Sequence, residues 1–292
     1  MTTYSATRTL ARSRSDKSRA RATSALRFSI LWVVALVVVL GPMVLIVITA
    51  LKPTDEAHSV NLRLPTRVEF WQNLHTVLTE GNVVQGFLNS LLISVPSILL
   101  LLFFGSMCAW VFARSKKRSV KVIYYIAISG IMLPPTIVTT LRVLDAIGLS
   151  DTQIGLILFY AGTQLSIAIF LMTGFVKSIP IELEEAASID GAGTLRVYWS
   201  IILPSLRPVL LTTAVILSLV IWNDFMTPFF LLPNQSEQTL PLGLYNFASA
   251  NTYELNWNLI FTQIMLVSMP LLILYLVAQR RIVSGLLSGS VK

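Results

Sequence analysis

The chain has 292 residues, of which 54% are hydrophobic and only 12% are charged, and its mean hydropathy is +0.73. Soluble domains carry about a quarter of their residues as Asp, Glu, Lys or Arg, so this chain has too little polar surface for a water-exposed globule. The dominance of apolar residues and the lack of low-complexity repeats exclude the disordered and fibrous classes. A lone cysteine, Cys108, permits no intrachain disulfide. The composition indicates an integral membrane protein.

The chain opens on a basic segment, residues 1–27, with seven Lys or Arg residues and Asp16 as its one acid. We expect a disordered cytoplasmic tail that also contacts anionic lipid. Its Arg- and Ser-rich composition leaves an organelle transit peptide as the alternative. A secretory signal is disfavoured, because the apolar run that follows is longer than a signal-peptide core and no A-x-A site follows it.

Six apolar segments follow the tail, and a helix needs about 20 such residues to cross a bilayer. We therefore predict an all-α integral membrane fold with six transmembrane helices. The spans are placed near residues 29–51, 88–112, 122–141, 154–176, 207–230 and 258–278. The fifth is long enough only if Asp224 is admitted, and Pro134-Pro135 predicts a break in the third. A β-barrel is disfavoured, because the runs are continuous instead of alternating with period two.

The distribution of Lys and Arg predicts the orientation of these spans. Of the 22 Lys and Arg residues, 18 lie in the N-terminal tail, in the second connection, in the fourth connection with Arg207 at its end, and at the C-terminal end. The other connections hold the remaining four. Positive residues are enriched on the cytoplasmic side, so both termini and the fourth connection, residues 177–206, are predicted to be cytoplasmic. The net charge of +8 therefore marks topology. It does not indicate nucleic-acid binding, which needs a basic face on a folded soluble domain.

The fourth connection reads as two short helices joined by a turn. Pro180 suits a first helical turn, and three acids follow where the helix dipole favours them, at residues 182, 184 and 185. The stretch Asp190–Gly193 should end this helix, because glycine accepts the left-handed conformation of a C-terminal cap. A second helix is expected over Thr194–Leu203, with Pro204 at its end or at a kink. This pattern fits a knob that docks another protein, and it equally fits an ordinary amphipathic connector.

The same connection carries a spaced motif. Glu185-Ala186-Ala187 is followed after three residues by Gly191, and after nine more by Ile201-Ile202-Leu203-Pro204. This spacing resembles the EAA loop of ABC importer permeases at every fixed position. Further segments resemble the smaller permease subunit of maltose-type systems, in the sugar-importing branch of that family. They are Asn89-Ser90-Leu91, Ser178-Ile179-Pro180, Ile189–Ala192, Trp222–Phe225, Thr239–Leu244 and Val283-Ser284-Gly285.

The resemblance covers residues 28–292 and implies a transmembrane permease domain of the type I ABC importer fold. It implies that the loop docks on a cytoplasmic ATPase, with Glu185 as the acidic contact, Ala186 and Ala187 as a close-packed face and Gly191 as the turn. Leu203-Pro204 would anchor the knob to the fifth span, and Asp190 and Ile201 complete the coupling residues. The implied location is the cytoplasmic (inner) membrane of a bacterium or archaeon.

The resemblance also implies the partners: a second permease subunit that is a distinct homologous chain, two ATPase subunits, an external solute-binding lipoprotein, and a sugar as substrate. The chain carries no Walker-type G-x-x-x-x-G-K-[ST] sequence. ATP and Mg²⁺ are therefore expected in the partner ATPases, and no cofactor, metal or catalytic residue is expected in this chain.

A polar cluster near the outer end of the fifth span is the candidate solute contact. Asp224 is the one acid inside a predicted span, and such residues often mark a transport pathway. Asn223 and Trp222 beside it suit a sugar, which offers hydroxyls and an apolar ring face. The alternative is an interfacial carboxylate reaching water, next to an aromatic-belt tryptophan.

Two other function classes are weighed against the importer. An enzyme is disfavoured, because His58 and His75 are the two histidines and show no H-E-x-x-H spacing. A passive channel would need no coupling loop. An importer permease for a peptide, polyamine or phosphate remains the main alternative.

Overall fold

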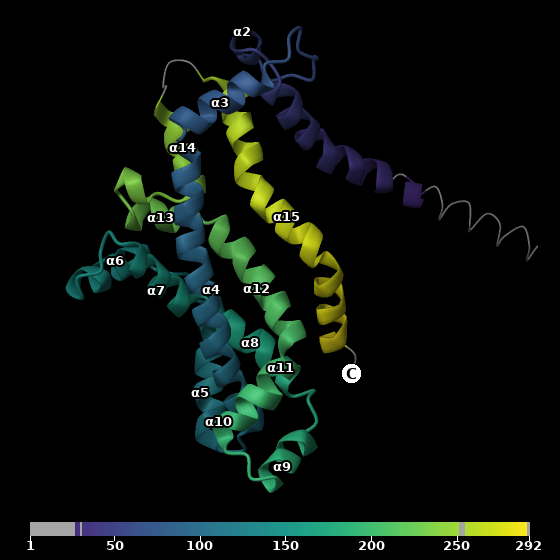
Figure 1. Cartoon of the computed structure of the whole chain (residues 1–292), viewed down its shortest axis with the longest axis vertical. Coiled ribbons are helices and arrows are strands. Elements are labelled where there is room, and N and C mark those ends of the chain that lie inside the picture. Colours follow the sequence, from purple (N-terminus) through teal and green to yellow (C-terminus); the bar gives the residue numbers. More distant parts are fainter. Residues whose placement is uncertain (1–26, 30, 251–254, 291–292) are drawn as a thin grey trace, which may run out of the picture. The chain divides into compact units, whose positions relative to one another are not determined.

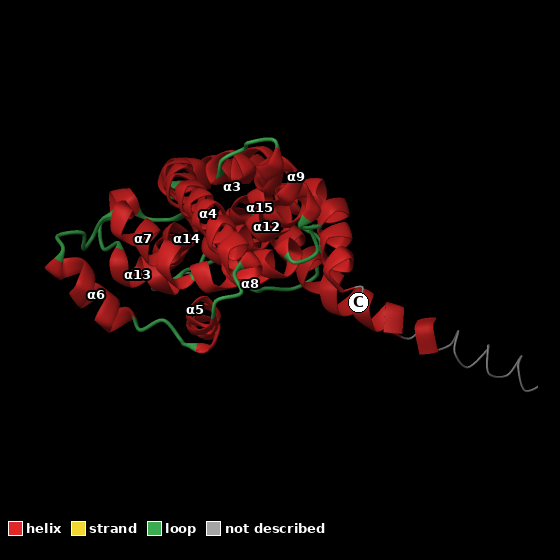
Figure 2. Cartoon of the chain, turned by 90° about the horizontal axis from the view of Figure 1, so that it is seen from below, coloured by secondary structure: helices red, strands yellow, loops and turns green. Residues whose placement is uncertain are grey.

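The computed structural model describes residues 27–29, 31–250 and 255–290. The predicted disorder of the tail therefore lies outside the described residues, except at Arg27. Within these ranges every regular element is a helix, and Figure 2 shows helices and connecting loops without a strand.

Three helices are long and apolar enough to cross a membrane. They are Arg27–Ala50, α4 (Val83–Arg114) and the apolar part Trp257–Gln279 of α15 (Trp257–Ser290). They correspond to the predicted first, second and sixth spans. The prediction of 88–112 for the second is too short, because the helix already starts after Asn82, whose left-handed backbone (φ 48°) ends the preceding turn.

The other three predicted spans are bent pairs of helices, so a total of six requires each pair to cross once. The bends are 117° between Arg118–Met132 and α6 (Ile137–Ala146), 43° between α7 (Gln153–Thr163) and α8 (Leu165–Val176), and 71° between Thr194–Ser205 and α12 (Arg207–Trp222). The first pair, in which α5 (Arg118–Ser129) runs into η1 (Gly130–Met132), confirms the break predicted at Pro134-Pro135.

The predictions of continuous fourth and fifth spans, over 154–176 and 207–230, are wrong. The fourth breaks at Gln164, one residue after Thr163, whose hydroxyl donates to the Phe159 carbonyl. The fifth ends at Trp222 and resumes as α13 (Met226–Leu231). Asp224 accepts a hydrogen bond from the Thr227 backbone N–H, so its side chain starts the new helix instead of continuing the old one.

The larger of two compact units comprises Leu74–Leu255 and Gln263–Lys292. Its central element is α4, which packs against α7, α8, α12 and α14 (Leu240–Ala250) and runs along the unit in Figure 1. Small side chains permit the close approach: a Cβ on Gly105 would stand 3.0 Å from the Cβ of Ala168 in α8. Such small-residue contacts are the usual way for helices to pack in a membrane.

The smaller unit comprises residues 1–73 and 256–262. It contains Arg27–Ala50, α2 (Thr54–Ala57) and the start of α3 (Phe70–Glu80). The buried Asn73 amide donates to the carbonyls of Ala50 and Lys52. The Thr66 hydroxyl and backbone N–H donate to the Glu56 carboxylate, and these bonds lower the pKa of Glu56.

Candidate functional site

The first arm of the fourth connection (residues 177–206) is α9 (Glu182–Ile189), which carries its three acids in the first turn. The helix ends as predicted. Gly191 has φ +80°, its N–H donates to the Ser188 carbonyl, and the Ala192 N–H donates to the Ala187 carbonyl. Glycine adopts this left-handed conformation without steric cost. Pro180 precedes the helix by two residues, so its predicted place in the first turn is wrong.

The second arm runs from Thr194 to Ser205, close to the predicted second helix. It consists of α10 (Thr194–Val197), a five-residue π-helix, η2 (Tyr198–Ile202), and α11 (Leu203–Ser205). Leu203 packs against the hydrophobic core. The 71° bend lies at Leu206, between Pro204 and Pro208, which lack the N–H groups that a continuous helix needs.

The exposed side of the knob is formed by Glu185, Ala186, Ile189, Asp190 and Gly191. Ile189 is 86% exposed, which is unusual for so large an apolar residue next to acids. Together these residues form a mixed apolar and acidic surface at the tip of the unit, at the end of α4 opposite α14 (Figure 1).

Ala187 does not belong to that surface. It is half-buried and packs against the core of its own unit. Of the two alanines grouped by sequence as one docking face, Ala186 alone is exposed.

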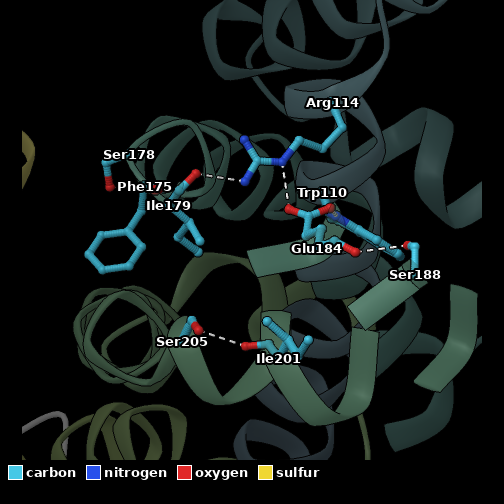
Figure 3. A network of polar contacts seen from close by, with 9 residues as sticks. All are labelled: Trp110, Arg114, Phe175, Ser178, Ile179, Glu184, Ser188, Ile201 and Ser205. Carbon is cyan, nitrogen blue, oxygen red and sulfur yellow. Dashed lines mark hydrogen bonds and ion pairs between the residues drawn. The ribbon is translucent and has the colours of Figure 1, made fainter. Parts of the chain in front are cut away.

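Glu184, which the sequence did not single out, faces inward (Figure 3). Its carboxylate accepts a hydrogen bond of 2.7 Å from Arg114 Nε and one of 2.9 Å from Trp110 Nε1, both on α4. Arg114 Nη2 also donates to the Ile179 carbonyl at 2.8 Å. Arg114–Glu184 is the one ion pair formed among the residues that the structure describes.

A second feature is a cavity of about 360 Å³ at the two helix breaks. One wall comes from the break after α5, including Pro134, Pro135 and Thr136, and the other from the break between α7 and α8. Irregular backbone at membrane depth is tolerated where it lines a cavity or is buried in protein. Residues of both breaks line this one cavity.

The cavity has mixed walls: threonine, serine and amide side chains alternate with apolar ones. Gln164 lines it, and its buried Oε1 has no hydrogen-bond partner in the structure. A buried polar atom without a partner is costly, so Gln164 is the residue of this lining that most needs an explanation. Its sequence signal was modest: the polar pair Thr163-Gln164 after Gly162 in an otherwise apolar run.

The three residues proposed from sequence as solute contacts lie in different environments. Trp222 is buried and its Nε1 donates to the Val267 carbonyl of α15. Asn223 is exposed, and Asp224 accepts a hydrogen bond of 3.0 Å from the buried Tyr160 hydroxyl. None of the three lines the cavity at the helix breaks. Their role in the pathway stays a prediction, and the structure adds a packing role for Trp222 and Asp224.

Replacing Asp224 by alanine should destabilise the fold, since the change removes a helix cap and leaves the Tyr160 hydroxyl unpaired. We expect a loss of about 1–3 kcal/mol, measured as a lower midpoint of thermal denaturation in detergent. Asn223→Ala is the control, because the Asn223 side chain is exposed and bonds the Leu219 carbonyl of its own helix. Equal midpoints for the two variants would contradict the cap.

Near the N-terminal end of α4, two side chains form hydrogen bonds to the segment between α13 and α14. Asn89 Nδ2 donates to the carbonyls of Ser236 and Gln238, around η3 (Gln235–Glu237), and Ser90 Oγ accepts from the Leu240 N–H. Two segments that carried the resemblance, Asn89-Ser90 and Thr239–Leu244, are therefore in direct contact.

Residues 85–287 match the family "Binding-protein-dependent transport system inner membrane component". The chain therefore belongs to that family of transport-system membrane subunits.

Two curated relatives are similar over most of their length. One is the diacetylchitobiose uptake system permease protein NgcG of Streptomyces coelicolor, 33% identical over 94% of this chain and 92% of that protein. Another is a probable starch degradation products transport system permease protein, AmyC, of Thermoanaerobacterium thermosulfurigenes, 34% identical over 90% and 93%.

A solved structure shares the fold. It is a bacterial ABC transporter involved in the import of the acidic polysaccharide alginate, with a TM-score of 0.76 at 22% identity, over 91% of this chain and 97% of that chain.

Proposed function

We propose that this chain is the permease subunit of an ATP-driven importer that moves a sugar or oligosaccharide into the cytoplasm. The observation that carries the proposal is the coupling loop, in which an EAA-spaced sequence forms an exposed knob closed by a left-handed glycine. Relatives named for diacetylchitobiose, for starch degradation products and for melibiose, raffinose and stachyose support a carbohydrate as substrate.

The chain works inside an assembly. Two ATPase subunits bind ATP and Mg²⁺ and receive the knob through Glu185, Ala186 and Gly191. A second, homologous permease chain completes the pathway, and an external binding protein delivers the solute. Six spans, with Arg207–Trp222 in the fifth, place both termini and residues 177–206 in the cytoplasm. The distribution of 18 of 22 basic residues supports this orientation.

Transport follows alternating access. ATP binding closes the ATPases, the knobs move together, and the helices rock from inward- to outward-facing. The cavity at the two helix breaks offers the solute a place to bind, where Gln164 and the neighbouring threonines would bond sugar hydroxyls. Hydrolysis then reopens the inner side.

The substrate class is tested by uptake into proteoliposomes that contain this chain, its partner permease, the ATPases and the binding protein. Radiolabelled diacetylchitobiose, maltotriose, raffinose and trehalose serve as probes, with phosphate, spermidine and a tripeptide as competitors. We expect ATP-dependent uptake of at least one sugar, which the competitors do not reduce. Uptake of a competitor alone would favour the non-sugar alternative, and sugar uptake without ATP would indicate a channel.

A further inference from the structure

One face of α4 holds the coupling loop at three successive helical turns. Ser106, Trp110 and Arg114 are spaced four residues apart and so lie on the same side of the helix. Ser106 Oγ and the Tyr198 hydroxyl are 2.7 Å apart in a buried hydrogen bond to the second arm. Trp110 and Arg114 bond Glu184 in the first arm. Both arms of the loop are therefore fixed to a single transmembrane helix.

The hydrogen bonds to the Glu184 carboxylate are strong for side chains near the surface of the unit. Both carboxylate oxygens are used, and the side chains of Arg114 and Glu184 are only 19% and 13% exposed. Charge-assisted hydrogen bonds are shorter and stronger than neutral ones, and partial burial reduces screening by salt. Arg114 also bonds the Ile179 carbonyl just after α8, so one guanidinium connects α4, α9 and the end of α8.

Glu184 and Glu185, two neighbouring acids in the first turn of α9, therefore have different roles. Glu185 is exposed on the knob, whereas Glu184 points back to α4 (Figure 3). A force applied to the exposed side of α9 reaches α4 through Glu184. It then reaches the helices packed on α4, which include α7 and α8 at the cavity.

We propose that Glu184 is a positioning residue: with Arg114 and Trp110 it makes α9 and α4 move as one body, so that motion of the docked knob becomes motion of the transmembrane helices. This inference rests on the proposed docking of α9 to an ATPase. The contact of Glu184 with Arg114 and Trp110, called the anchor below, lies within this chain, so it can be tested separately from the docking.

The test measures the distance between α9 and α4 in the assembled transporter in nanodiscs. Spin labels are attached to cysteines at Leu183 and Val111, which are both exposed, in a Cys108→Ser background. Distances are recorded without nucleotide and after trapping with ATP, Mg²⁺ and vanadate. The variants are Glu184→Ala, which removes both acceptor oxygens, and Glu184→Gln, which keeps one.

Glu182→Ala is the matched control. Glu182 lies in the same first turn and carries the same charge, but it is exposed and forms no ion pair in the structure. The two alanine variants therefore change helix propensity and the interaction with the helix dipole alike. They differ because only Glu184→Ala removes the hydrogen bonds to Arg114 and Trp110.

We expect a narrow distance distribution that trapping leaves unchanged in the parent and in Glu182→Ala. Glu184→Ala should broaden the distribution both without nucleotide and after trapping. Glu184→Gln should give a width between those of the parent and Glu184→Ala. In proteoliposomes, sugar transported per ATP hydrolysed should fall about tenfold in Glu184→Ala, a size typical of coupling between sites, while the ATPases remain bound. A role in stability alone would lower transport and hydrolysis together and leave that ratio unchanged.

Two results would overturn the inference. One is a Glu184→Ala distribution as narrow as that of the control, and the other is an unchanged ratio of transport to hydrolysis. If the ATPases do not bind the parent chain at all, the proposed function fails. The distances without nucleotide still report whether the anchor exists.

Discussion

Gly191→Pro is expected to reduce ATP-driven sugar uptake by tenfold or more, while the chain still inserts into the membrane. Proline fixes φ at about −65°, whereas Gly191 has φ +80°. Proline also removes the N–H that bonds the Ser188 carbonyl. The end of α9 must therefore rebuild, and the exposed residues of the knob change direction. The measurement is uptake and sugar-stimulated ATP hydrolysis in the reconstituted complex.

A pair of alanine variants isolates the backbone effect. A Cβ at Gly191 or at Gly193 would meet no atom within 4 Å, but Gly193 has φ −69°, which any residue adopts. Gly191→Ala should therefore impair coupling, because alanine in the left-handed region costs about 1–2 kcal/mol, and Gly193→Ala should not. Full sugar-stimulated hydrolysis in Gly191→Pro would remove this turn from the coupling mechanism.

Gln164→Leu is expected to raise the apparent KM for sugar uptake by about tenfold or more, since loss of a bond to a substrate hydroxyl weakens recognition by that order. Leucine keeps most of the side-chain volume but removes the amide of a residue that lines the cavity. Coupling should be unaffected, so the ratio of transport to hydrolysis at saturating sugar should equal that of the parent. Initial uptake rates over a range of sugar concentrations measure this effect.

A matched pair of threonines provides the control. Thr163 and Thr173 each donate to the carbonyl four residues earlier, at 2.9 and 2.6 Å, but only Thr163 lines the cavity. Thr163→Val should therefore raise KM and Thr173→Val should leave it unchanged. If Gln164→Leu and Thr163→Val both transport with the parental KM, the solute does not bind at the helix breaks.

The sequence predicted the helical class, the positions of the apolar segments and the end of α9. These features depend on local properties: the length of an apolar run, the fixed φ of Pro134-Pro135, and the conformational freedom of Gly191. The break at Gln164 and the early end of the fifth span at Trp222 were missed. Neither break is marked by a proline, and each falls within a segment that is apolar overall, so charge and hydropathy do not reveal it.

By itself, the sequence determined that this is a membrane permease with one EAA-spaced loop, because composition and motif spacing are properties of the linear chain. The tertiary structure alone decided which of two adjacent glutamates faces outward and that Gln164 lines a cavity. The physical reason is distance along the chain. Glu184 meets Arg114 across 70 residues, and Asn89 meets Gln238 across 149, and only packing brings such partners together.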